Sequence, residues 1–239
     1  MSELVELLLP RLRPVGPPFD YALWSLFAPS SMAPSRLLTL EVERKFSRLA
    51  VQPLTLAGGH PPFRSLRYLG LRSMHDIYYD LDGLLSSKGI WVRKRDGDWE
   101  AKIKDGGNFQ NSRFMEMRNP EEISRHLQLY TGISQTELTN FGLRELASFT
   151  TFRQSWVVDD DFTIVQDTVD FDNHTVGEVE LQCTLPRSPS SIRTTEEERA
   201  LRLEEMDSRI RRFMTRYAWA FHVGQPKGKL AAFLERISN

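Results

Sequence analysis

The stretch Leu-Glu-Val-Glu-Arg-Lys-Phe, residues 40–46, decides how this chain folds. In a β-strand successive side chains point to opposite faces, so Glu41, Glu43 and Lys45 share one face. The apolar residues of the stretch occupy the other face. One strand of this kind is ordinary at a protein surface, and the pattern becomes informative only where it recurs.

The same alternation recurs in later stretches, at residues 91–95, 99–104, 114–117 and 176–181. In an antiparallel sheet that closes on itself, such charged stripes meet in a polar lumen. The pattern therefore predicts a closed antiparallel barrel with the charged stripes inside. An open sheet with one solvated face fits the alternation as well and stays an alternative.

Turn and helix signals divide the rest of the chain. The expected strands lie near residues 37–47, 72–80, 89–96, 98–105, 112–118, 147–158, 162–170 and 174–184. The stretch 51–69, with its glycine and proline pairs, predicts a loop with at most a short helix. Helices are expected from Pro120 to about Tyr130, from Thr195 onward, and after Gly228. Three aspartates at 159–161 predict a hairpin turn.

Composition limits the partners and the compartment. Hydrophobic residues make up 40% of the 239, and the 31 basic and 32 acidic residues nearly cancel, which argues against a nucleic-acid partner. No apolar run approaches the roughly 20 residues of a membrane span. The single cysteine, Cys183, excludes an internal disulfide and favours a cytoplasmic location. The histidines lack the spacing of a zinc site. We expect a monomer. Residues 1–36 are expected to form a flexible, proline-rich leader, and residues 37–239 the folded domain.

The predicted lumen contains both signs of charge. Its acids are Glu41, Glu43, Glu116, Glu178 and Glu180, with Asp167, and its bases are Lys45, Arg93, Arg95 and Lys102, with Arg153. Burying so many ions without partners is costly. Arginine and lysine suit a polyphosphate, and clustered carboxylates suit a hard divalent cation that bridges to phosphate oxygens. The residues therefore predict a magnesium–polyphosphate site, unless the charged stripes merely face solvent in weak ion pairs.

An ordered set of motifs carries a family resemblance over roughly residues 37–237. The set is Glu41-x-Glu43-x-Lys45, Tyr78-Tyr79-Asp80, Trp91-Val92-Arg93-Lys94-Arg95, Trp99-Glu100-Ala101-Lys102, Arg153-x-x-Trp156, Asp167-Thr168-x-Asp170 and Val176-Gly177-Glu178-Val179-Glu180, with Lys229-Leu230 at the end. It resembles the CYTH family of triphosphate tunnel enzymes, and the resemblance implies an α+β fold, an eight-stranded antiparallel β-barrel with helices packed outside. Within that family, Trp91 and the stretch 176–180 look most similar to thiamine-triphosphatases.

The resemblance implies a hydrolase that removes the terminal phosphate of thiamine triphosphate with Mg²⁺, or Mn²⁺ in its place. By similarity, the phosphate-binding residues are Lys45, Arg93, Arg95, Lys102, Arg153 and Lys229, and the metal-binding residues are Glu41, Glu43, Asp167, Glu178 and Glu180. Glu116 supports the bases. This chain departs from close relatives at Val165, where they carry an acid, and the departure bears on whether one or two metal ions bind.

Catalytic roles follow from charge. Glu178 or Glu180 can orient the attacking water, and Lys102, helped by Tyr78, can stabilise or protonate the leaving oxygen. Trp91 either stacks on a flat cationic ring such as thiamine or plugs the barrel end. Two other functions remain open: an enzyme for inorganic triphosphate or a nucleotide, including adenylyl cyclase chemistry, and a non-catalytic polyphosphate-binding domain.

Overall fold

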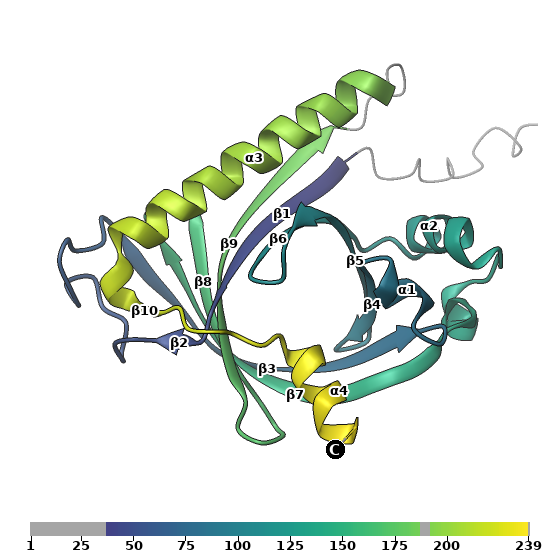
Figure 1. The fold of residues 1–239 in the computed structure, drawn as a ribbon, viewed down its shortest axis with the longest axis horizontal. Coiled ribbons are helices and arrows are strands. Elements are labelled where there is room, and N and C mark those ends of the chain that lie inside the picture. The colour runs from purple at the N-terminus through teal and green to yellow at the C-terminus, as the bar shows by residue number, and fades with distance from the viewer. Residues whose placement is uncertain (1–36, 187–191, 239) are drawn as a thin grey trace, which may run out of the picture. The chain divides into compact units, whose positions relative to one another are not determined.

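Eight antiparallel strands close into a barrel in the order β1-β6-β5-β4-β3-β7-β8-β9 (Figure 1), as the alternation predicts. The strands are β1 (Leu37–Phe46), β3 (Leu66–Asp80), β4 (Ile90–Arg95), β5 (Asp98–Gly107), β6 (Asn111–Met117), β7 (Arg144–Val158), β8 (Phe162–Val169) and β9 (Thr175–Pro186). A separate two-stranded sheet joins β2 (Arg48–Leu49) to β10 (Phe221–His222). This computed structural model describes residues 37–186 and 192–238, so the predicted leader lies outside the described residues.

In the described residues, four α-helices accompany the strands: α1 (Leu84–Ser87), α2 (Pro120–Thr131), α3 (Ile192–Arg216) and α4 (Lys229–Ser238). Short 3₁₀ turns cover Glu137–Gly142 and Ala218–Ala220. The start of α2 shows why its prediction was correct. Pro120 occupies the first turn, and the Asn119 side chain accepts a hydrogen bond from the Glu122 backbone at 3.0 Å. Gly132, with φ 68°, ends the helix.

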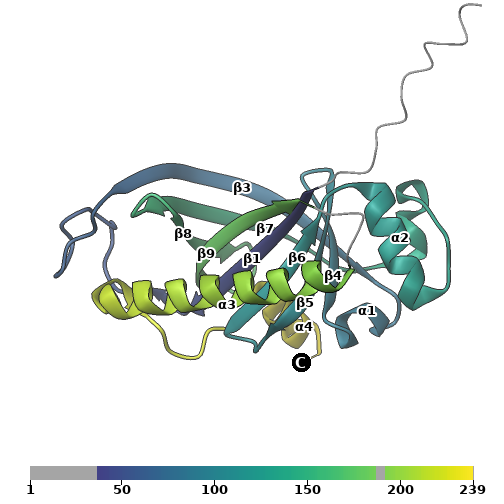
Figure 2. The ribbon, with the colours of Figure 1, turned by 90° about the horizontal axis from the view of Figure 1, so that it is seen from above.

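The apolar faces of the strands point outward, against the helices. Figure 2 shows α3 running along the outside of β1 and β9, where Leu40 and Val42 are almost fully buried with Leu203 and Ile210. A second outer core joins α1 and α2 to β4 and β5. Burial of each such side chain contributes about 1.5–3 kcal/mol, so the helices fix the direction of β1, β4, β5 and β9. The charged stripes are left to face the lumen.

The structure extends β3 and β7 beyond the predicted bounds. β3 begins at Leu66, inside the stretch predicted to be a loop, and β7 begins at Arg144. The first half of β3 is exposed on both faces and is interrupted by a bulge at Gly70, whose φ is 105°. An exposed strand shows no alternation, so the sequence pattern missed it. α1, β2 and β10 are too short to leave a periodic signal.

The hairpin turn between β7 and β8 forms as predicted at residues 159–161. Its buried Asp159 carboxylate accepts hydrogen bonds from the backbone N–H groups of Arg64 and Ser65, and at 2.7 Å from the Tyr217 hydroxyl. These hydrogen bonds lower the pKa of Asp159 although burial opposes them. The turn thereby joins the start of β3 to the residue that follows α3.

Candidate active site in the barrel lumen

Strand register brings the predicted charged residues into contact. The cross-strand neighbours in the lumen are Glu43 and Glu180, Lys45 and Glu178, Asp76 and Arg95, Arg93 and Glu100, Lys102 and Glu116, and Arg153 and Asp167. Most of these pairs join opposite charges, which stabilises the sheet. Glu43 and Glu180 are the exception, because two carboxylates face each other there.

These side chains surround a cavity of about 420 Å³. Among the described residues, eight basic and six acidic side chains line it, a surplus of two positive charges. Each predicted site residue lines the cavity except Asp167, which is 1% exposed and contacts the lining residues Arg153 and Lys229. The charged stripes therefore converge on an interior channel, and the open-sheet alternative is wrong.

Lys102 lies at the centre of one acidic cluster. Its Nζ is 2.5 Å from Glu41, 3.3 Å from Glu116 and 3.5 Å from Glu43. Burial alone would lower the pKa of Lys102, but these carboxylates raise it well above the ordinary value. Burial raises the pKa of Glu41 to about 7, against the opposing effect of Lys102. The lysine thus remains charged in a buried position.

Asp167 joins two bases that come from distant parts of the chain. Arg153 donates to both of its carboxylate oxygens, each at 2.7 Å, and Lys229 from α4 forms an ion pair with it. Although burial opposes ionisation, Lys229 and Arg153 lower the pKa of Asp167. Asp167 therefore fixes the positions of Arg153 and Lys229 relative to each other.

Two arginines from β4 form a second basic group. Arg95 makes a two-pronged contact with Asp76 at 2.7 and 2.8 Å. Arg93 donates to Glu100 at 2.6 Å and to the Tyr78 hydroxyl at 3.2 Å. Tyr78 is therefore held by Arg93, and its predicted partnership with Lys102 has no contact of this kind to support it.

Three lumen carboxylates offer oxygen ligands for a cation. Burial and the neighbouring Glu178 raise the pKa of Glu43, and burial raises that of Glu180 well above its ordinary value. Although burial opposes it, Lys45 with nearby bases keeps the pKa of Glu178 at about 2. The described residues contain no ready-made group of three metal ligands. Lys45 forms ion pairs with both Glu43 and Glu178.

The donor set nevertheless fits a hard divalent cation. It consists of carboxylate oxygens only, and the repulsion that Glu178 and Glu41 exert on Glu43 and Glu180 is what a cation would relieve. Val165 lies directly opposite Glu178 and is 1% exposed, so an apolar side chain occupies the strand position where the resemblance leads one to expect an acid.

A family model for the CYTH domain matches residues 39–214. The chain belongs to the CYTH family. CYTH enzymes act on the phosphoanhydride bonds of triphosphates, generally with a divalent metal ion, and this CYTH lumen presents basic groups and carboxylates suited to both. In the described part of the chain, no helix has the length and apolar character needed to span a membrane.

Solved structures similar to this CYTH chain include three distant ones. The PH1819 protein of Pyrococcus horikoshii is 17% identical, with a TM-score of 0.42 over 82% of this chain and 99% of the other. A candidate adenylyl cyclase from Hippeastrum, described as having a dominant triphosphatase activity, is 16% identical, with a TM-score of 0.44 over 82% and 96%. A candidate adenylate cyclase from Bacillus halodurans is 12% identical, with a TM-score of 0.35 over 69% and 85%. No curated protein matches the sequence significantly.

The CYTH lumen also contains residues that the sequence analysis did not select. Arg118 lines the cavity with its side chain 69% exposed, 3.6 Å from Glu100 and 3.9 Å from Glu116. It lies two residues after Glu116, so extending the alternation past the end of β6 would have found it. Phe114 packs edge-on against Trp91, with ring centroids 5.6 Å apart. No charge pattern signals this apolar contact.

Proposed function

We propose that this chain hydrolyses thiamine triphosphate to thiamine diphosphate and phosphate, with Mg²⁺ as the metal ion and Mn²⁺ able to replace it. The observation that carries the proposal is the position of Trp91. It lines the same cavity as the phosphate-suited bases, on the same strand as Arg93 and Arg95. An aromatic wall next to a basic channel suits a substrate with a flat ring joined to a chain of phosphates.

The basic side chains of the lumen bind the phosphates in this scheme. The proposed set is Lys45, Arg93, Arg95, Lys102, Arg153 and Lys229. Each is held by at least one carboxylate before substrate arrives, so little rearrangement is needed to direct positive charge at the phosphoryl oxygens. Preorganised charge of this kind is the main catalytic device in phosphoryl transfer.

The carboxylates would hold the metal ion. Glu43, Glu178 and Glu180 are proposed as direct ligands, with Glu41 and Asp167 acting through water. A divalent ion bound there would neutralise charge on the phosphoryl oxygens. The apolar Val165 beside these ligands supports a single ion.

The chain's own groups account for proton movement. Water adds to the terminal phosphorus while the bond from that phosphorus to the bridging oxygen breaks. Glu178, ionised because its pKa is about 2, orients the water, whose proton it can pass to solvent. Glu180, whose pKa is raised, has the more basic carboxylate of the two, so Glu178 serves to orient the water and Glu180 is the stronger proton acceptor when it is ionised. Lys102 stabilises the leaving diphosphate oxygen.

A substrate panel tests the proposal. Phosphate release is measured from thiamine triphosphate, inorganic tripolyphosphate and ATP, each with Mg²⁺, Mn²⁺ or EDTA, together with cyclic nucleotide formation from ATP. Wild-type protein and Trp91→Ala are compared, with Trp91→Phe as the control that keeps an aromatic ring. We expect Trp91→Ala to raise KM about tenfold for thiamine triphosphate, the equivalent of a lost stacking contact, and to leave tripolyphosphate cleavage unchanged.

Other outcomes select the alternatives. Equal loss on both substrates means that Trp91 plugs the barrel and does not stack, which favours an inorganic tripolyphosphatase. That second function is supported by the two-charge basic surplus of the cavity, which does not favour the cationic thiamine ring. Binding of tripolyphosphate without release from any compound identifies a non-catalytic domain. The monomeric state and the cytoplasmic location stay predictions.

A further inference from the structure

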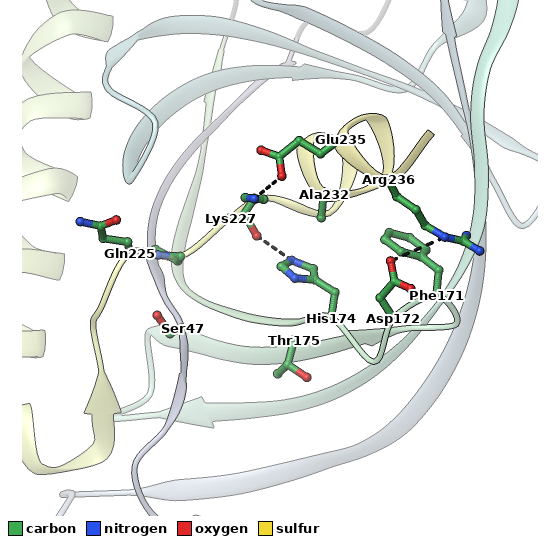
Figure 3. Close-up of a pocket in the computed structure, with 11 residues that line it drawn as sticks. Ser47, Phe171, Asp172, His174, Thr175, Gln225, Lys227, Ala232, Glu235 and Arg236 are labelled. Atoms are coloured by element: carbon green, nitrogen blue, oxygen red, sulfur yellow. Dashed lines mark hydrogen bonds and ion pairs between the residues drawn. The ribbon is translucent and has the colours of Figure 1, made fainter. Parts of the chain in front are cut away.

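The helix α4 separates two cavities. One face of the helix lines the lumen and the other lines a second cavity of about 410 Å³, shown in Figure 3. Lys229, Leu230, Ala231 and Leu234 line the lumen, and Ala232, Glu235 and Arg236 line the second cavity. The helix packs on the barrel through Phe233, which contacts Phe149 and Phe171. The start of the helix, where Lys229 lies, needs contacts of its own.

The backbone before α4 does not fix the helix by itself. Residues 223–228 form neither helix nor strand, and they include Gly224, Pro226 and Gly228. Lys229 follows immediately, is 8% exposed, and reaches Asp167 across the lumen. Its ammonium group can keep that position only if contacts from the barrel hold the start of the helix.

The turn between β8 and β9 supplies such contacts from three side chains. The His174 Nε2–H donates to the backbone carbonyl of Lys227 at 2.8 Å, because a carbonyl oxygen can only accept (Figure 3). Phe171 packs edge-on against Phe233, with centroids 5.4 Å apart. Asp172 forms an ion pair with Arg236 at 3.6 Å, with both side chains more than half exposed.

The three contacts from this turn differ in which part of α4 they can hold in place. The exposed Asp172–Arg236 pair is weak, and Phe171 contacts the middle of α4. The His174 hydrogen bond reaches the backbone two residues before Lys229, at the point where the coil becomes helix. The same hairpin carries Asp167 and Glu178, so it holds both the lysine and the acids that surround it.

We propose that His174 is a positioning residue for Lys229, acting through the Lys227 carbonyl to hold the start of α4 against the barrel. The inference rests on the proposed function in one respect, that Lys229 binds a substrate phosphate. His174 itself touches no lumen residue in this scheme and takes no part in the chemistry.

The first test compares three variants with wild-type protein. His174→Ala removes the donor, and His174→Gln offers an amide N–H to the same carbonyl. His75→Ala removes an exposed histidine whose ring hydrogen-bonds to the hydroxyls of Ser148 and Thr150. Tripolyphosphate binding is measured by calorimetry in EDTA. KM and kcat for tripolyphosphate cleavage are measured with Mg²⁺. Thermal denaturation of each variant verifies folding, and His174→Leu replaces His174→Ala if the latter is unfolded.

We expect His174→Ala to weaken tripolyphosphate binding about three- to tenfold, the equivalent of one net hydrogen bond, and to raise KM by the same factor with kcat unchanged. His174→Gln should recover most of the affinity, and His75→Ala should match wild type. Equal affinities of His174→Ala and wild type would overturn the proposal. So would a loss that His174→Gln does not repair.

A double-mutant cycle tests the route through Lys229. In a Lys229→Met background, adding His174→Ala should change tripolyphosphate affinity no further, because the group that His174 positions is already absent. Independent, multiplicative losses would show that His174 acts elsewhere. Wild-type protein that binds tripolyphosphate but releases no phosphate would refute the hydrolase proposal alone, since this cycle is measured by binding.

Discussion

Replacing Lys102 by methionine removes the central cation of the lumen and nearly preserves its volume. Lys102 lies 2.5 Å from Glu41 and 3.3 Å from Glu116. At an effective dielectric constant of about 20, the attraction between Lys102 and Glu116 at 3.3 Å amounts to about 5 kcal/mol. Leaving a buried charge without its partner costs about 3–5 kcal/mol. The variant can avoid most of that cost at pH 7 by protonating Glu41, whose pKa is already about 7.

The expected loss of unfolding free energy at pH 7 is therefore about 1–3 kcal/mol, the cost of a buried polar group without its partner. A carboxyl group whose pKa is higher in the folded than in the unfolded state takes up a proton on folding, so stability falls as pH rises between the two values. In the wild type this effect of Glu41 ends near pH 7. In Lys102→Met the loss of stability through Glu41 continues above pH 7. The difference in unfolding free energy between the variant and wild type therefore widens by about 1.4 kcal/mol per pH unit.

Urea denaturation at pH 6, 7, 8 and 9 measures the gap, and phosphate release measures turnover, which we expect to fall at least about tenfold. Lys94→Met is the control, because Lys94 lies outside the lumen with its Nζ 5.5 Å from the centre of the Trp99 ring. Parallel stability curves for wild type and Lys102→Met would refute the electrostatic account. Unchanged turnover would remove Lys102 from the chemistry.

Two further predictions concern residues at the rim and outside the lumen. Arg118→Gln should raise KM for a triphosphate about three- to tenfold with kcat unchanged, and should weaken the salt dependence of KM. The control is Arg144→Gln, which changes a similarly exposed, ion-paired arginine and should match wild type. An unaltered KM in Arg118→Gln would show that Arg118 does not meet substrate. Asp159→Asn should lower the unfolding free energy by about 1–3 kcal/mol at pH 7. The pKa of Asp159 is lowered in the fold, so its charge stabilises the protein above the unfolded value of 3.8, and this stabilisation is lost as pH falls through the folded value. Urea denaturation should therefore show the difference in unfolding free energy between wild type and Asp159→Asn shrinking below about pH 4. A difference that stays constant with pH would contradict the account.

The barrel and its charged lumen were predictable because one pattern determines both. A period of two assigns each residue of a strand to a face, and apolar residues such as Val42 then fix which face is outside. All but one of the predicted site residues consequently line the cavity. Their chemical roles stay predictions, since alternation says where a side chain points and not what it binds.

Features without periodicity could not be predicted. The first half of β3 has no buried face, so nothing in its sequence separates it from a loop. The pairing of Asp167 with Lys229 depends on where α4 packs, and no local pattern near residue 229 encodes that position. The contact between Trp91 and Phe114 likewise depends on how three strands are aligned side by side, which is decided by the whole sheet.

The closure of the barrel through β1 has a consequence for biosynthesis. β1 pairs with β6 on one side and with β9 on the other, so residue 43 meets its neighbour at residue 180 only late in translation. Contacts so distant in sequence form slowly, and a nascent chain that lacks β9 has an unclosed sheet. A ribosome-bound fragment ending before residue 175 therefore contains Arg153 but lacks β9, which carries its neighbours Glu178 and Glu180. The lumen is complete only after β9 and then Lys229 on α4 have been added.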